Sequence, residues 1–265
     1  MIASFKPHLN LKDVIREYYL SSIYAFGETK LIPIVDDCCH DIIYYKQAKA
    51  ELIYGEKQTV ENMECHLFTI LGLTPPYVLK YKDELTFFTI KFQPWMNNFF
   101  FGHLKQIGIV DLEDHFSELK PVLNEIEQKD KIENSLEEVN RYFTNLDIEL
   151  SPKVKIVKLI CEFIYDNKGM VKVNDISTHF KKTRQYINKI FKKEVMCSLK
   201  TFITSVKILA LVKQKSKAEE QSLTELAYDY GYFDQAHFIN DFKKVCGVTP
   251  SQYFGDLPDF ILRHD

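Results

Sequence analysis

The spacing of apolar residues changes near Trp95 and divides the chain into two parts. Before it, runs rich in β-branched and aromatic residues predict strands at residues 41–45, 64–70 and 85–92. Turn signals separate these runs at Gly55-Glu56-Lys57, Gly72, Pro75-Pro76 and Lys82-Asp83-Glu84. Residues 11–24 precede them with the spacing of a helix, carried by Val14, Ile15, Tyr18 and Tyr19.

After Trp95 the spacing becomes helical. Apolar residues recur three and four positions apart in residues 99–106, 112–127 and 132–146, and Ser135 with Glu138 has the form of a capping box. Ser151-Pro152 then begins a new element. We therefore expect an α+β protein, in which a β-rich N-terminal domain (1–117) is followed by a helical connector (118–150), an all-α C-terminal domain (151–254) and a short tail (255–265).

The C-terminal domain contains a first pair of short helices. An amphipathic helix over residues 154–165 precedes it and ends at Asp166-Asn167-Lys168-Gly169. The first helix of the pair, with Ile176 and Phe180 on one face, leads through Lys181-Lys182 to Thr183, a suitable N-cap for the second. That second helix places Ile187, Ile190 and Phe191 inward. Its outward side chains suit base edges and phosphates, and they are Arg184, Gln185, Asn188 and Lys189.

The same pattern returns about fifty residues later. Ser222 and Glu225 form a capping box at the start of a short helix, and Gly231 supplies the left-handed residue that a tight corner requires. Asp234 then caps a helix with Phe238 and Phe242 inward. Its predicted DNA-contacting residues are Gln235, Ala236, His237, Asn240 and Lys243. Each pair of helices therefore has the form of a helix-turn-helix unit.

A helix predicted over residues 199–213 joins the two units and spans about 22 Å. A rigid connection of this length is suited to holding two recognition helices in successive major grooves, about 34 Å apart.

The charge of the chain is divided in the same way. Residues 151–254 contain 18 Lys and Arg against 10 Asp and Glu, whereas residues 1–150 contain 15 against 24. A basic segment joined to an acidic one indicates that the C-terminal part meets the polyanion.

Residues 231–253, GYFDQAHFINDFKKVCGVTPSQY, resemble the C-terminal hallmark of the AraC/XylS family of transcription regulators. The resemblance covers about one hundred residues and implies a seven-helix domain of two DNA-binding units. The chain departs from the family pattern at four positions, which are Lys181, Met196, Lys207 and Phe254. Ile32-Pro33-Ile34 and Phe92-Gln93-Pro94 are similar, more loosely, to an N-terminal domain of some members, which implies sensing or dimerisation.

Other interpretations of the N-terminal residues stay open. Its aromatic residues favour a sheet core, with a ligand pocket in a small barrel as the alternative. Asp36, Asp37, His40 and Asp41 are interpreted as an acidic surface turn rather than a catalytic or metal-binding cluster. The six cysteines, including adjacent Cys38 and Cys39, lack the spacing of a zinc site or a disulfide framework and are expected to be free thiols.

We therefore expect a cytoplasmic, sequence-specific regulator of transcription that binds double-stranded DNA, with no enzymatic activity, no catalytic or metal site and no cofactor. A small-molecule effector and a second copy of the chain are the further partners considered. No membrane partner is expected, because the chain has no apolar run near the length of a membrane span. The alternative is a metal- or ligand-dependent sensor, or an enzyme domain, fused to the DNA-binding module. Operator, effector, sign of regulation and oligomeric state do not follow from the sequence.

Overall fold

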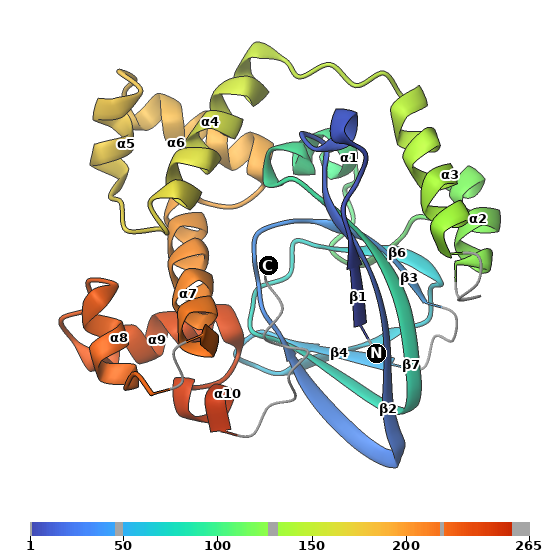
Figure 1. The fold of residues 1–265 in the computed structure, drawn as a ribbon, viewed down its shortest axis with the longest axis horizontal. Coiled ribbons are helices and arrows are strands. Elements are labelled where there is room, and N and C mark those ends of the chain that lie inside the picture. The colour runs from blue at the N-terminus through green and yellow to red at the C-terminus, as the bar shows by residue number, and fades with distance from the viewer. Residues whose placement is uncertain (1, 46–49, 127–131, 218–219, 256–265) are drawn as a thin grey trace.

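The computed structural model describes residues 2–45, 50–126, 132–217 and 220–255, so all of the predicted tail except Gly255 lies outside the described residues. Its N-terminal part is a sheet with short helices, and its C-terminal part is helical (Figure 1). The expected α+β fold class is confirmed. The strands are β1 (Ile2–Phe5), β2 (Ile15–Ile34), β3 (Asp41–Tyr45), β4 (Ala50–Tyr54), β5 (Thr59–Met63), β6 (Leu67–Leu71), β7 (Tyr77–Phe92) and β8 (Gly108–Asp111).

Two long antiparallel strands, β2 and β7, form the centre of the sheet. The strand order is β1-β2-β7-β3-β6-β8, with β4 pairing the first half of β7 and β5 pairing β4. Both strands bend where the register shifts between Tyr24 and Thr29, opposite Asp83, which has a φ of 70°. The prediction of a turn at residues 82–84 was wrong, because these residues form a bulge inside one continuous strand.

The prediction of a helix over residues 11–24 was also wrong. A short 3-10 turn at Leu9–Leu11 is followed by strand β2. Its apolar residues are buried on both faces of the sheet: Tyr18 lies against α3, where its hydroxyl donates to Asn140 Oδ1 over 2.9 Å, while Ile23 faces the other side. Two buried faces remove the alternation by which an isolated strand is recognised.

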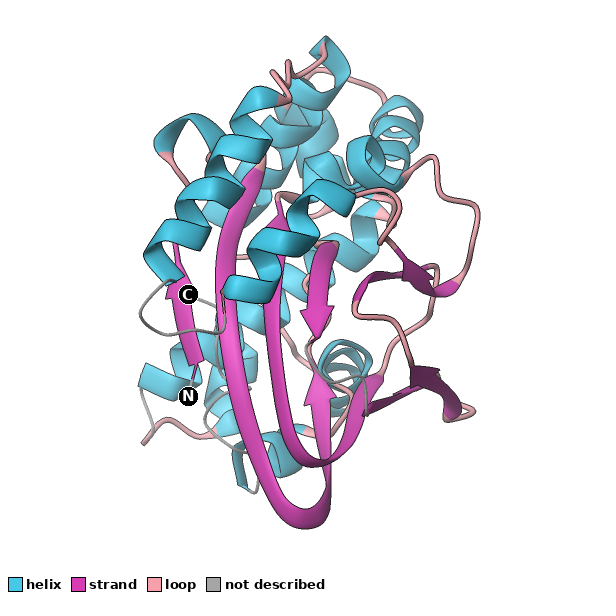
Figure 2. Cartoon of the chain, turned by 90° about the vertical axis from the view of Figure 1, so that its right-hand side faces the viewer, coloured by secondary structure: helices cyan, strands magenta, loops and turns pink. Residues whose placement is uncertain are grey.

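The N-terminal helices pack on one side of the sheet. They are α1 (Asn97–Phe101), α2 (Lys120–Glu125) and α3 (Ile132–Asn145), and Figure 2 views the long strands from the side of α2 and α3. The predicted helices at residues 99–106 and 112–127 are shorter than expected, because β8 separates them. Ser135 does not open a helix: it is buried inside α3.

The C-terminal helices follow the predicted pattern closely. They are α4 (Pro152–Asp166), α5 (Val173–His179), α6 (Arg184–Val195), α7 (Leu199–Lys217), α8 (Leu223–Asp229), α9 (Gln235–Cys246) and α10 (Pro250–Gly255). Side-chain caps begin four of them as predicted, at Ser151, Thr183, Ser222 and Asp234. Helix α7 runs between the two helix pairs (Figure 1).

Lys181 and Met196, two of the positions at which the sequence departs from the family pattern, have left-handed backbones. Lys181 has a φ of 50° and Met196 a φ of 64°. The chain thus takes the conformation for which glycine is favoured without having glycine at either position. Each residue costs roughly 1–2 kcal/mol, which the packed helices on either side must offset.

Among the residues that the structure describes, no single helix is long and apolar enough to cross a membrane. Helices α6 and α7 reach that length and composition only when taken together, and they are bent by 68° at their junction.

Two glycines with a positive φ allow the steric and conformational contributions to be separated. Gly169 has a φ of 68°, and a Cβ there would lie 2.5 Å from the backbone nitrogen of Lys207 on α7. Gly231 has a φ of 73°, and a Cβ there would meet nothing within 4 Å.

We expect Gly231→Ala to lower the free energy of unfolding by roughly 1–2 kcal/mol through backbone strain alone. Gly169→Ala should cost roughly 3 kcal/mol or more, because α7 must also move away from α4. Urea denaturation of the two variants measures the difference, with Gly255→Ala as a control that has neither feature. Equal losses for the two variants would contradict the close approach of Gly169 to α7.

Candidate nucleic-acid interface and internal cavity

The outward faces of α6 and α9 consist of the residues predicted to contact DNA. All nine are exposed, and they are Arg184, Gln185, Asn188 and Lys189 on α6 and Gln235, Ala236, His237, Asn240 and Lys243 on α9. The inward faces are buried, with Phe191 against Phe202 of α7 and Phe238 against Phe242. Burial of the aromatic face fixes the rotation of each helix, and it therefore decides which side chains point outward.

Side-chain caps hold the first turn of both helices. Thr183 Oγ1 accepts from Tyr186 N over 3.2 Å, and Asp234 Oδ1 accepts from Ala236 N over 2.9 Å. On α9, His237 Nε2 lies 3.2 Å from Asp241 Oδ2, one helical turn away. The histidine side chain is thus held along the outer surface of α9 while remaining exposed.

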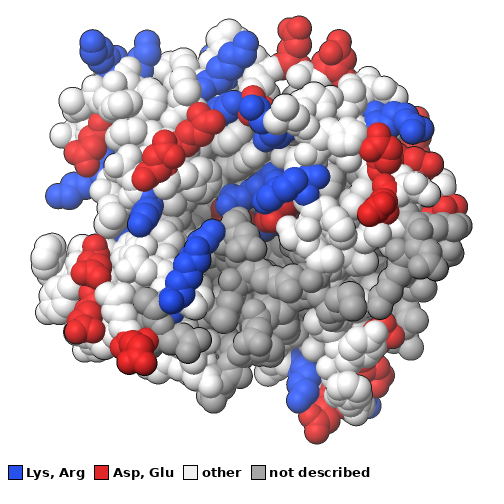
Figure 3. Space-filling model, viewed as in Figure 1, with Lys and Arg blue, Asp and Glu red and all other residues white. Residues whose placement is uncertain are grey.

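Basic and acidic side chains are unevenly distributed over the helical part. On the face shown in Figure 3, Lys and Arg side chains gather over the region of α4 to α6, while acidic side chains gather over the region of α8 to α10. The first unit therefore offers more positive charge on this face than the second.

The C-terminal ends of α6 and α9 both contact the loop between β2 and β3, residues 35–40, which we call the β2–β3 loop. The last carbonyls of a helix have no partner within the helix. Val245 O near the end of α9 accepts from the backbone nitrogen of Asp36 over 3.1 Å. Val195 O at the end of α6 accepts from Asn97 Nδ2 over 2.8 Å.

Asn97 connects α6 to the β2–β3 loop. Its side chain is fully buried, and Nδ2 also donates to Cys38 O over 2.9 Å. Its Oδ1 accepts from His40 N over 3.0 Å. One amide therefore satisfies backbone groups of the loop and of α6 at once, so that displacement of the loop disturbs the end of α6.

A cavity of about 550 Å³ lies between the sheet and the first helix-turn-helix unit. Alternate residues of the two long strands face it, namely Glu17, Tyr19, Ser21 and Ile23 of β2 and Phe87, Thr89 and Lys91 of β7. The β2–β3 loop forms one wall, and the α6–α7 junction, from Val195 to Ser198, forms another. Of the two alternatives for the aromatic N-terminal residues, the structure therefore has the pocket.

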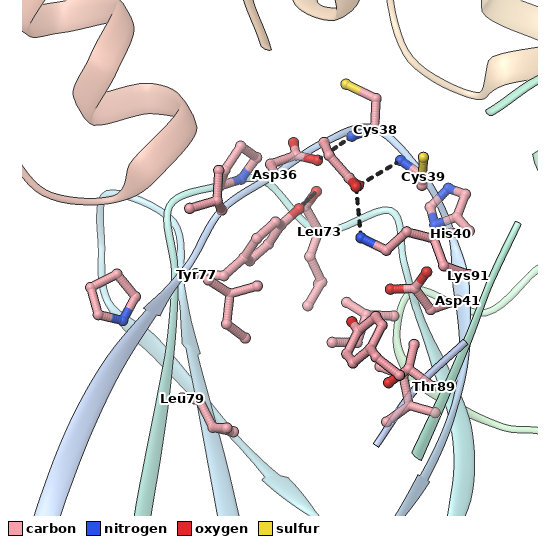
Figure 4. Close-up of a pocket in the computed structure, with 18 of the residues that line it drawn as sticks. Asp36, Cys38, Cys39, His40, Asp41, Leu73, Tyr77, Leu79, Thr89 and Lys91 are labelled. Atoms are coloured by element: carbon pink, nitrogen blue, oxygen red, sulfur yellow. Dashed lines mark hydrogen bonds and ion pairs between the residues drawn. The ribbon is translucent and has the colours of Figure 1, made fainter. Parts of the chain in front are cut away.

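The wall formed by the β2–β3 loop is charged (Figure 4). Lys91 Nζ donates to Asp37 Oδ2 over 2.6 Å, and both residues are only 6% exposed. Burial by itself would lower the pKa of Lys91, but the carboxylates of Asp37 and Asp41 outweigh it and hold that pKa well above its usual value. Lys91 thus remains charged and engaged inside the protein.

Two other groups of this wall titrate unusually. Burial raises the pKa of Asp41 to about 7, even though Lys91 lies nearby and acts to lower it. Burial lowers the pKa of His40 to about 4, so its imidazole is neutral at physiological pH. The prediction that residues 36–41 form an acidic surface turn was wrong, because these residues line the cavity.

A signal for this wall is present in the sequence. Lys91 interrupts the apolar run of residues 85–92, and a charged residue inside a buried strand needs a partner of opposite charge. The partner lies 54 positions earlier in the chain, so nothing in the sequence specifies which carboxylate it is. The described residues contain no group of three His, Cys, Asp or Glu side chains placed to hold a metal ion.

Comparisons with known proteins concern mainly the helical part. Residues 176–256 match the family described as a helix-turn-helix domain. The chain is 27% identical over 92 residues to the melibiose operon regulatory protein of Escherichia coli (strain K12), covering 34% of this chain and 30% of that protein. It is 26% identical over 106 residues to the probable transcription factor PqrA of Proteus vulgaris, covering 39% of this chain and 85% of PqrA.

The complete chain is similar in fold to an apo ToxT variant from Vibrio cholerae strain SCE256. That similarity has a TM-score of 0.50 at 12% identity and covers 93% of this chain and 98% of the other. It concerns the fold alone. The family match lies on α5 to α10, where the two capped helix pairs and their exposed outer faces are found. Residues 176–256 are therefore an AraC-type helix-turn-helix domain, as the resemblance of residues 231–253 predicted.

Proposed function

We propose that this protein is a sequence-specific, DNA-binding regulator of transcription whose N-terminal domain senses a small molecule in the internal cavity. The observation that carries the proposal is the pair of exposed outer faces on α6 and α9, held at the two ends of α7. Residues 1–117 would form the sensory domain, 118–150 the connector and 151–254 the DNA-binding domain. No step of this function requires catalysis.

DNA reading would involve both units. Helix α7 has 19 residues and therefore spans about 28 Å, which suits two recognition helices in successive major grooves about 34 Å apart. Arg184 and Gln235 occupy the first turn of α6 and α9, the part of a recognition helix that reaches base edges. Exposed lysines such as Lys243 would contact phosphates.

Sensing would act through the β2–β3 loop. This loop lines the cavity, and its neighbours include the C-terminal ends of both recognition helices. A ligand that moves the loop would change the position of α6 through Asn97 and that of α9 through the backbone of Asp36. The effector would then bias the relative placement of the two units, which decides whether both can bind one site.

Selection of bound sites from a random DNA pool tests the two-unit geometry. The selected sites should contain two short boxes whose centres lie about 10–10.5 base pairs apart. Arg184→Ala should relax one box and Gln235→Ala the other, each at a cost of about 1–3 kcal/mol for a lost bidentate contact. If both variants relaxed the same box, or if Arg184→Ala changed nothing, the two-groove geometry would be refuted.

Lys243→Ala should behave differently, because a phosphate contact carries no sequence information. We expect its affinity to fall equally for all sequences, and the slope of log affinity against log salt to decrease by about one. Titration of one selected site at several salt concentrations measures this slope. Asn145→Ala, a substitution on the exposed face of α3, serves as the control that should leave it unchanged.

Asn97→Ala tests the connection between the loop and α6. It leaves Val195 O, Cys38 O and His40 N without their partner, and each buried group costs about 1–3 kcal/mol. Urea denaturation should show a loss of several kcal/mol, with Asn145→Ala again unchanged. Hydrogen exchange should rise in both the β2–β3 loop and the end of α6. An increase confined to one of these segments would argue against coupling through Asn97.

A further inference from the structure

The charges that line the cavity are predominantly negative. Four carboxyl groups face it, those of Glu17, Asp36, Asp37 and Asp41, against the single ammonium group of Lys91. Asp37 already occupies that ammonium group at 2.6 Å. Arg16 lies behind this wall, where its guanidinium Nη1 donates to Tyr165 Oη over 2.8 Å and to Cys39 Sγ over 3.5 Å. Neither basic group is therefore free to receive an anion.

Polar atoms without a partner face the same space. Among the described residues, Ser21 Oγ and Asp41 Oδ1 are buried atoms that make no hydrogen bond, and both residues line the cavity. Ser21 is only 1% exposed. A buried acceptor that is left unpaired costs free energy, which a ligand with hydrogen-bond donors would recover.

The rest of the cavity wall is apolar and aromatic. Tyr45 and Phe87 lie with ring centroids 5.7 Å apart, and Ile23, Ile32 and Leu79 complete this side. Figure 4 shows Leu79 on the strand side of the cavity, away from the labelled charged residues. A volume of about 550 Å³ is in the usual range for a small-molecule site.

We propose that the effector is a cationic molecule with an apolar or aromatic body, whose ammonium or amidinium group binds Asp41 and its neighbouring carboxylates while the body lies against Tyr45 and Phe87. This ligand class rests on the proposed sensory function. A carboxylate ligand is disfavoured, because it would have to displace Asp37 from Lys91 and approach three further carboxyl groups.

Binding of a cation should be linked to the ionisation of Asp41. The pKa of this carboxyl is about 7 when the cavity is empty, and a bound cation favours the charged form. The affinity should therefore fall as the pH is lowered below 7, by up to about tenfold per pH unit, and level off above about pH 8. The charged and titratable groups that act on Asp41 are Lys91, Asp37, Glu17, Arg16, Tyr19 and Cys39. Lys91 and Arg16 stay protonated over this range.

Three probes that share one aromatic body test the charge preference. Tryptamine is cationic, tryptophol neutral and indole-3-acetate anionic at pH 8. Isothermal titration calorimetry of the full chain should show tryptamine binding at least about tenfold more tightly than indole-3-acetate. At pH 7, tryptamine binding should release about half a proton, which titrations in buffers of different ionisation enthalpy measure.

Asp41→Asn should remove most of the preference for tryptamine and abolish the proton release, while tryptophol binds as before. Asp114→Asn, at an exposed position outside the cavity, should change neither quantity. Glu17→Gln provides a second cavity variant, which should reduce the preference if Asp41→Asn does not fold. A melting temperature measured for each variant identifies those that are folded.

Equal or tighter binding of indole-3-acetate, or no binding of tryptamine at millimolar concentration, would overturn the proposed ligand class. Either result would leave DNA binding by the same protein intact. Failure of the unliganded and tryptamine-bound protein to select any DNA sequence would instead overturn the proposed function, while the charge preference of the cavity could still be measured.

Discussion

The carbonyl groups at the ends of two helices impose the main constraint on this structure. A helix that ends inside a protein must find donors for its last carbonyls. Here α6 and α9 find them in the N-terminal domain, through Asn97 and the backbone nitrogen of Asp36. Both donors belong to the β2–β3 loop or hold it in place. The two recognition helices are consequently referenced to one short segment of the other domain.

The same loop supplies three of the four carboxyl groups of the cavity if Asp41, the first residue of β3, is counted with it. Removal of charged groups from water is costly, and the Lys91–Asp37 ion pair offsets only part of that cost. The raised pKa of Asp41 is the measure of what remains. The wall that positions the recognition helices is therefore also the wall with the most free energy to gain from a ligand.

The sequence predicts the helical part far better than the sheet. Short-range signals define α6 and α9: a cap at Thr183 or Asp234, apolar residues at helical spacing and a left-handed residue at the corner. The sheet depends on long-range pairing. Tyr18 and Ile23 lie on opposite faces that are both buried, so β2 has the apolar spacing of a helix, and Asp83 resembles a turn although it lies in a bulge.

The site shows the same division. The outward residues of α6 and α9 follow from helical geometry, because each aromatic core residue determines which neighbours face solvent. The acidic residues 36–41 were predicted to be exposed because local composition favours a surface turn. Their burial depends on Lys91 and Asn97, which are distant in sequence, and on the α6–α7 junction that closes the cavity. No local pattern records those contacts.

The alternation along β2 and β7 has a consequence for how such a regulator can diverge. The cavity residues Tyr19, Ser21 and Phe87 alternate with residues that hold the sheet to its helices, such as Phe88. Exchange of the first set leaves strand register, domain contacts and recognition helices untouched. Duplicated copies of the gene could therefore acquire new effectors by a few inward-facing changes and keep their operators, or keep the effector and change the operator through the outer faces of α6 and α9.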